Sequence, residues 1–113
     1  AVGNRAVLDQ VQVTLYGKKG RELRLEGDEG AIDTVKRDFV LTQRTGLLAV
    51  QLESGYTIYT NHLAWTDASR EISTGDPVTM SGHGLEVRGV GLVGKLDTEE
   101  FQVLQDVHVE IVQ

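Results

Sequence analysis

Hydrophobic and polar residues alternate with a period of two along much of the chain. The alternation is clear over residues 11–15, 48–52 and 107–111. Because successive side chains of a strand point to opposite faces of a sheet, this period predicts strands that each have one apolar face. Two stretches that could form short helices, residues 28–36 and the segment near Glu99, lack a complete amphipathic repeat. The pattern therefore predicts an all-β fold.

Turn-forming residues separate these strands about every 8–12 residues, which is typical of a β-sandwich, a β-barrel or an array of stacked hairpins. Clusters of Gly, Asp, Ser, Thr and Pro predict turns at residues 17–20, 34–38, 53–55, 67–70, 74–77, 81–84 and 97–100. Three ten-residue segments, 24–33, 58–67 and 88–97, can be aligned, and each ends in Asp. Asp suits the start of a turn because its carboxylate accepts hydrogen bonds from nearby backbone N–H groups. A true repeat would imply units that bury their apolar faces by stacking.

Composition and charge narrow the function classes. At 113 residues the chain has room for one domain. Its formal net charge of −6 argues against nucleic acid as the main partner, since phosphate binding needs clustered Lys and Arg. There is no cysteine, so disulfides and thiolate metal sites are excluded. No segment approaches the ~20 consecutive apolar residues of a membrane span.

The residues that could carry catalysis do not form a convincing constellation. His62, His83 and His108 are scattered, and no pair has the spacing of metal ligands. Residues 89–94 have the letters of a GxGxxG dinucleotide fingerprint, but no amphipathic helix follows them. Glycines inside a strand instead indicate a bend, a bulge or a close backbone approach. We therefore expect neither an enzyme nor a cofactor.

The C-terminal half of the chain resembles the periplasmic lipopolysaccharide-export proteins of the LptC type and their relatives of the LptA/OstA type. The resemblance is carried by Pro77-Val78 at the start of a strand, by Gly89 and Gly91, and by the alternating segment 101–111. Upstream, residues 11–33 and 39–67 look like earlier copies of the same hairpin unit. The likeness therefore spans most of the chain.

This resemblance implies an open β-jellyroll of stacked antiparallel hairpins, V-shaped or slightly twisted, whose apolar interior holds the acyl chains of lipopolysaccharide. It implies a single domain over residues 1–113 and a non-enzymatic transfer function. Since the chain is short for the family, we expect a trimmed N-terminus. Gly89 and Gly91 are expected to let their strand bend. The residues expected to line the lipid trough are Leu25, Phe39, Leu41, Leu52, Ile58, Val78, Met80, Val87, Val103, Val107 and Val109.

Members of this family assemble edge to edge and build a bridge from the inner to the outer membrane. The resemblance implies lipopolysaccharide, an LptA-type bridge protein and the inner-membrane export ABC transporter as partners, together with head-to-tail self-association. It implies a periplasmic location and an N-terminal helix, absent from this sequence, that anchors the protein to the inner membrane. The edge expected to pair with a partner is formed by Val107, His108, Val109, Glu110 and Ile111.

Two other functions stay open at the level of the sequence. If the apolar stripes pack into a closed core, the chain is a structural β-module that assembles with other proteins and binds no lipid. Alternatively, Tyr56, Tyr59 and Trp65 lie close together in the sequence and could form a carbohydrate-binding face. Aromatic residues of this kind are more often core or edge anchors.

Overall fold

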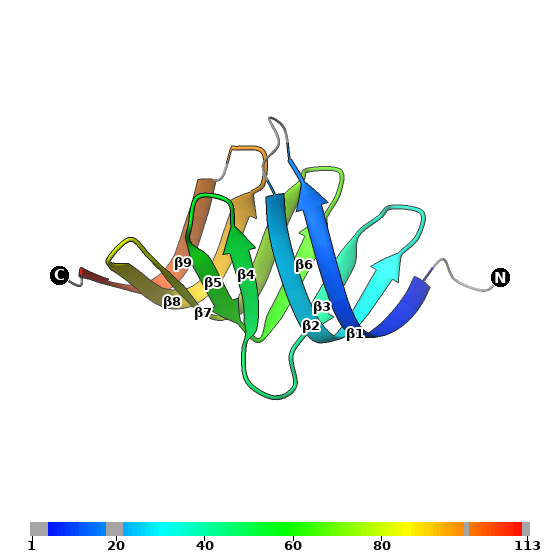
Figure 1. The fold of residues 1–113 in the computed structure, drawn as a ribbon, viewed down its shortest axis with the longest axis horizontal. Coiled ribbons are helices and arrows are strands. Elements are labelled where there is room, and N and C mark those ends of the chain that lie inside the picture. Colours follow the sequence, from blue (N-terminus) through cyan, green and yellow to red (C-terminus); the bar gives the residue numbers. More distant parts are fainter. Residues whose placement is uncertain (1–4, 18–21, 99, 112–113) are drawn as a thin grey trace.

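Antiparallel strands make up most of the computed structural model, which describes residues 5–17, 22–98 and 100–111 (Figure 1). The nine strands found in these residues are β1 (Arg5–Tyr16), β2 (Glu22–Asp33), β3 (Phe39–Thr42), β4 (Leu48–Leu52), β5 (Thr57–Thr60), β6 (His62–Thr66), β7 (Glu71–Gly82), β8 (Leu85–Lys95) and β9 (Glu100–Ile111). The prediction of an all-β fold is confirmed. Within the same residues there is no helix long and apolar enough to cross a membrane.

Two long strands, β2 and β7, each pair with two different strands along one edge and so pass from one half of the fold to the other. The first part of β2 pairs with β4, and its last part pairs with β3. In the same way β7 pairs first with β6 and then with β5. The first half-sheet contains β4, β5 and the parts of β2 and β7 that pair with them. The second half-sheet contains β3, β6 and the parts of β2 and β7 that pair with those two strands. The remaining strands extend both halves, since β1 pairs along β2, β8 along β7 and β9 along β8.

The two half-sheets meet in a V. Its vertex is the line where β2 and β7 change partners, and it lies at the bottom of Figure 1, where the long strands bend. Its open side, which we call the seam, is where the end of β1 at Tyr16 faces the β6–β7 turn (67–70) and the β8–β9 turn that begins at Leu96. The strands are therefore continuous through the vertex, whereas the two half-sheets are not joined by the chain at the seam.

Bulges mark the vertex in the C-terminal strands. The pairing of β7 with β8 shifts between Thr74 and Pro77, so Gly91 faces two residues of β7. The prediction of a turn at 74–77 is therefore wrong, because β7 runs without interruption from Glu71 to Gly82. A bulge accommodates an extra residue while the ladder resumes on both sides, and such a site also tolerates proline, which cannot donate to the ladder.

The other predicted turns agree with the structure where it describes them, except that Ser81 and Gly82 belong to β7 and Glu100 belongs to β9. Residues 34–38, 53–55 and 67–70 all lie between strands. His83 and Gly84 have φ values of 51° and 75°, as a two-residue type I′ hairpin requires. The turn predicted at 17–20 and Glu99 of the last predicted turn lie outside the described residues, apart from Gly17.

The core fills the V between the two half-sheets. Leu48, Val50 and Ile58 from the first half-sheet and Leu63 and Leu92 from the second have no measurable solvent exposure. These residues belong to the alternating apolar positions of their strands, so the period of two that predicted strands also placed one face of each strand inside.

Candidate functional site

A continuous row of apolar residues crosses the inner face of the first half-sheet from β1 to β9. Each member of the row pairs directly with the next on the adjacent strand. The row consists of Val13, Leu25, Val50, Ile58, Met80, Val87 and Val109. The neighbouring row on the outer face is polar throughout and consists of Thr14, Arg24, Gln51, Thr57, Ser81, Glu86 and Glu110. The sheet thus separates an apolar inner face from a polar outer face over its full width.

The second half-sheet carries a matching inner row. Its members, again paired strand to strand, are Ala6, Ile32, Phe39, Trp65, Ile72, Gly94 and Phe101. Gly94 does not interrupt the apolar surface, because the ring of Phe101 occupies the space that a Cβ at Gly94 would need. The interior is therefore lined on both sides by apolar side chains.

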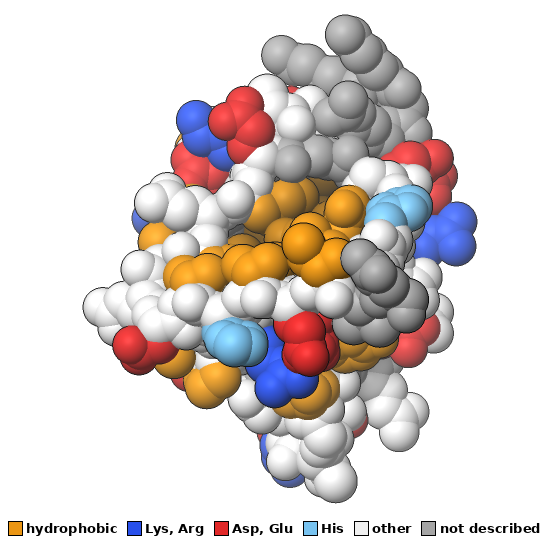
Figure 2. All heavy atoms as spheres, turned by 90° about the vertical axis from the view of Figure 1, so that its left-hand side faces the viewer, with side chains coloured by type: hydrophobic (Ala, Val, Ile, Leu, Met, Phe, Trp, Pro, Cys, Tyr) orange, Lys and Arg blue, Asp and Glu red, His pale blue; other side chains and the backbone are white. Residues whose placement is uncertain are grey.

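The interior is closed in the middle and open at the β8–β9 end. Leu25 and Ile58 in the row of the first half-sheet are fully buried, whereas Val109 at the end of the same row is 54% exposed. Figure 2 shows the molecule from this side: hydrophobic side chains gather in a hollow between rims of polar and charged ones. We call this feature the apolar trough and define it by Met80, Val87, Val103 and Val109.

The eleven residues predicted to line a lipid trough fall into two groups. Six of them are packed against other side chains in the core: Leu25, Phe39, Leu41, Leu52, Ile58 and Val78. Met80, Val87 and Val103 are half-buried, and Val107 and Val109 are exposed. The residues with surface open to a ligand are therefore the five on β7, β8 and β9.

Gly89 and Gly91 lie where β8 changes register against its neighbours. Between Arg88 and Val90, one residue of β8, Gly89, faces two residues of β9. A Cβ at Gly89 would overlap Cγ1 of Val103 and lie 2.9 Å from the carbonyl oxygen of Gln105. Gly91 has a φ of 83°, a conformation that side chains disfavour. Both glycines therefore lie at register shifts of β8, and their role in bending the strand stays a prediction.

The strands at the two ends of the fold, β1 and β9, each pair with one neighbour. Within the described chain, no second strand covers the outer edge of β9 or of β1. The predicted partner edge, residues 107–111, is the part of β9 that pairs with the beginning of β8. Along this edge Val109 faces the trough side, while His108 and Glu110 belong to outer-face rows with Arg88 and Glu86.

The three aligned aspartates all lie at the rim of the second half-sheet, at the end of β2, after β6 and after β8. Asp33 accepts hydrogen bonds from the backbone N–H groups of Lys36 and Val35, both at 3.0 Å, and these bonds hold its pKa below the ordinary value. Asp67 instead accepts a hydrogen bond from Nε1 of Trp65 at 3.3 Å. The capping role predicted for these aspartates is thus found at Asp33, and the alignment reflects strands that end at one rim.

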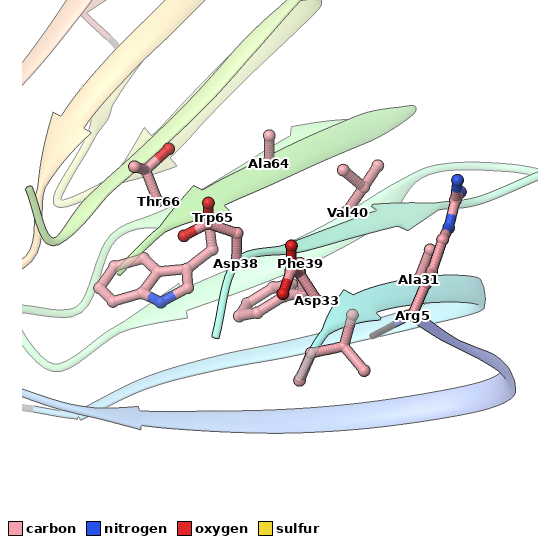
Figure 3. Close-up of a pocket in the computed structure, with 10 residues that line it drawn as sticks. Arg5, Ala31, Asp33, Asp38, Phe39, Val40, Ala64, Trp65 and Thr66 are labelled. Carbon is pink, nitrogen blue, oxygen red and sulfur yellow. The ribbon is translucent and has the colours of Figure 1, made fainter. Parts of the chain in front are cut away.

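A pocket of about 440 Å³ opens between the starts of β1 and β3 and the ends of β2 and β6 (Figure 3). Phe39 and Trp65 stack in its wall with ring centroids 6.2 Å apart. Its two carboxylates are both held by the backbone, because Asp38 accepts a hydrogen bond from the N–H of Asp67 at 2.9 Å and Asp33 caps its turn. Both carboxylates of the pocket therefore accept hydrogen bonds from backbone N–H groups at the rim.

The aromatic residues considered for carbohydrate binding do not share a surface. Trp65 is 2% exposed and faces the interior from the second half-sheet. Tyr59 belongs to the outer face of the first half-sheet, where it pairs with Ala49 and Thr79. Tyr56 packs its ring edge-on against His83 with centroids 5.0 Å apart. The prediction of a joint sugar platform is therefore wrong, since strand alternation and the two half-sheets separate the three rings.

Sequence reasoning missed part of the interior. Leu63, Ile72 and Leu92 are as deeply buried as Leu25 and Ile58, which the sequence predicts to face the interior. The strand pairing could have indicated two of them, because Leu63 pairs with Leu41 and Leu92 pairs with Val103. Among the described residues there is no group of three or more His, Cys, Asp or Glu side chains that could hold a metal ion.

The fold and its two inner rows define a β-jellyroll with a hydrophobic interior that is open at the β8–β9 end. The chain belongs to the lipopolysaccharide-assembly, LptC-related family, whose model matches residues 1–112. Among solved structures, the chain is similar to LptH, described as the LptA homologous periplasmic component of the conserved lipopolysaccharide transport device from Pseudomonas aeruginosa. The likeness has a TM-score of 0.67 at 9% identity and covers 96% of this chain and 95% of that chain, so it shows a shared fold. A sequence search of curated proteins gives no match. The predicted family and the predicted jellyroll are confirmed.

Proposed function

We propose that this protein is a non-enzymatic module of the periplasmic bridge that moves lipopolysaccharide toward the outer membrane, and that it holds acyl chains in the apolar trough. Membership of the LptC-related family supports a part in lipopolysaccharide assembly. The observation that carries the proposal is the inner row that leaves the buried core at Ile58 and continues to the exposed Val109.

The physical basis is the transfer of acyl chains out of water. Each buried CH₂ group stabilises the complex by about 0.8 kcal/mol, without any requirement for a polar or catalytic group. Met80, Val87, Val103, Val107 and Val109 offer such a surface, and the core residues behind them extend it if the half-sheets separate. The lipid headgroup would remain in solvent, because the inner rows contain no charged residue.

Assembly with partners would use the edges of β1 and β9. An open strand edge can add a strand of another protein through main-chain hydrogen bonds. Residues 107–111 form such an edge, and pairing there would continue the row of Val87 and Val109 onto the next protein. An LptA-type bridge protein, the export transporter and a second copy of this chain are the proposed partners, with anchoring at the inner membrane.

Site-specific photo-crosslinking tests the proposed function. A photoreactive residue at Val87 or Val109, which face the trough, should form adducts with lipopolysaccharide. The matched controls are Arg88 and His108, the adjacent residues that pair with each other on the outer face. Adducts from the trough positions alone are the expected result. Equal labelling from both faces, or none in folded protein, would contradict the trough and favour a structural module with a closed core.

A further inference from the structure

This inference rests on the proposed function: if the protein holds acyl chains, a chain must be able to enter the packed centre of the V. Leu25, Val50, Ile58, Leu63 and Leu92 leave no solvent-exposed surface there. The half-sheets cannot separate at the vertex, where β2 and β7 run continuously from one to the other. They can separate only at the seam, where noncovalent contacts hold them together.

Arg70 spans this seam. Its Nη2 donates a hydrogen bond of 2.6 Å to the backbone carbonyl oxygen of Tyr16, 54 positions away in the sequence and on the opposite half-sheet. Its Nε lies 3.1 and 3.0 Å from the two carboxylate oxygens of Asp97. Figure 1 shows the end of β1 together with the β6–β7 and β8–β9 turns at the top of the molecule. One side chain thus connects three separate segments at the open side of the V.

The surroundings of Arg70 fix the position of its guanidinium group. The carbonyl of Arg70 accepts a hydrogen bond from the N–H of Leu96 at 3.1 Å, which ties the β6–β7 turn to the β8–β9 turn. The guanidinium carbon lies 5.6 Å from the centre of the Trp65 ring, within the range of a cation–π contact. Trp65 and Leu96 are both 2% exposed, so Arg70 lies directly above the closed core.

Three other polar contacts between described rim residues each stay within one half-sheet. His83 Nε2 contacts the carbonyl of Ser54 at 2.8 Å inside the first half-sheet, and Asp67 contacts Asp38 inside the second. The ion pair of Arg88 with Glu86, at 3.0 Å, joins two residues of the same strand. Arg70 differs from these groups because its hydrogen bond to Tyr16 joins the two halves.

We propose that Arg70 is a latch that holds the seam closed and must release Tyr16 before an acyl chain can enter the central core. Asp97 and Trp65 position the guanidinium group for this role. Release breaks the hydrogen bond to Tyr16 and leaves the contacts of Arg70 with Asp97 and Trp65 in place. The latch therefore sets the rate at which lipid reaches the packed interior, while the exposed trough at the β8–β9 end remains accessible in the closed state.

A reversible crosslink tests the latch directly. The chain contains no cysteine, so Tyr16→Cys with Arg70→Cys provides two unique thiols. A short bis-thiosulfonate reagent would close the seam, and a reductant would reopen it in the same sample. Transfer of fluorescent lipopolysaccharide from a micelle to the protein is followed by stopped-flow, with thermal unfolding as the check on folding. We expect the crosslinked form to keep only the uptake that the exposed trough allows and to lose the uptake into the central core, which should return on reduction. Uptake at the same rate in both forms would overturn the latch.

A single substitution supplies the second test. Arg70→Met keeps an apolar stem over Trp65 but loses the hydrogen bond, and Arg88→Met removes an exposed ion pair of similar length as the matched control. We expect about tenfold faster uptake in Arg70→Met, the effect of losing one charged hydrogen bond that is partly screened by solvent. We expect no change in Arg88→Met. Equal rates in the two variants would overturn the latch, whereas absence of lipid binding in the wild-type protein would overturn the proposed function and the latch with it.

Discussion

Gly89 and Gly75 provide a matched pair of substitutions that tests the bulged vertex. Gly89 faces two residues of β9, and Gly75 lies in the other bulge, between Thr74 and Pro77 of β7. A methyl group at Gly89 would overlap Val103 and approach the carbonyl of Gln105, whereas a methyl group at Gly75 would have nothing within 4 Å. The same change, glycine to alanine, therefore meets opposite steric conditions at two bulges, on the bulged strand at Gly75 and on the strand facing the bulge at Gly89.

The expected free energies follow from these contacts. Forcing a methyl group into a filled site costs about 1–3 kcal/mol, and the loss is larger where a backbone atom is among the neighbours. Alanine in place of glycine also restricts the unfolded chain, which stabilises the protein by about 0.4–1 kcal/mol where the native conformation accepts it. Gly89→Ala should thus lower the free energy of unfolding by about 1–2 kcal/mol, while Gly75→Ala should raise it slightly.

Urea denaturation followed by the emission of Trp65 measures both effects, because Trp65 is the single tryptophan and is buried. The two midpoints of thermal unfolding should differ by roughly 10 °C, given ~4 °C for each kcal/mol in a domain of this size. Adding Val103→Ala should reduce the cost of Gly89→Ala but not abolish it, because Gln105 remains. Equal stabilities of the two glycine variants would refute the assignment of a steric role to Gly89.

Two further predictions concern the core and one turn. Ile58→Ala should lower the free energy of unfolding by about 2–5 kcal/mol, because Ile58 is fully buried in the inner row. Gln51→Ala, at an exposed position, should change it by less than ~0.5 kcal/mol. Similar losses of stability for both variants in chemical denaturation would contradict the faces assigned to these residues. Asp33 should titrate, by NMR, below the ordinary Asp pKa of about 3.9. Because its folded pKa is lowered, its stabilisation is present above the unfolded pKa and is lost as the pH falls through the folded pKa. The stability difference between wild type and Asp33→Ala should therefore shrink in acid, and a pH-independent difference would exclude this cause.

Local sequence signals predicted the strands and most turns because they depend on neighbouring residues. Alternation marked β4 and the end of β9, and His83-Gly84 formed the hairpin expected between two strands. The same local reasoning failed at residues 74–77, where Gly75, Asp76 and Pro77 have the composition of a turn. The structure instead uses them in a bulge of β7, because β8 pairs on both sides and keeps the ladder continuous.

The composition of the site was less predictable than the fold. Alternation identified the inward residues, but it could not separate the closed centre, such as Ile58, from the open end at Val109. Ile58 and Val109 both lie at apolar positions of alternating segments. Their solvent exposure depends on whether the other half-sheet lies opposite them across the interior. The contact of Arg70 with Tyr16 was equally hidden, since it joins residues 54 positions apart that share no motif.

The sequence by itself determined an all-β fold with one apolar face on most strands, and its motifs resembled those of the LptC-type proteins. The fold class follows from side-chain alternation and turn chemistry, which act over a few residues. Only the tertiary structure decided that β2 and β7 belong to two half-sheets, that the interior closes at Ile58 and opens at Val109, and that Arg70 bridges the seam. These features depend on which strands pair and on the angle between the halves, and both are set by packing between residues that are distant in the chain.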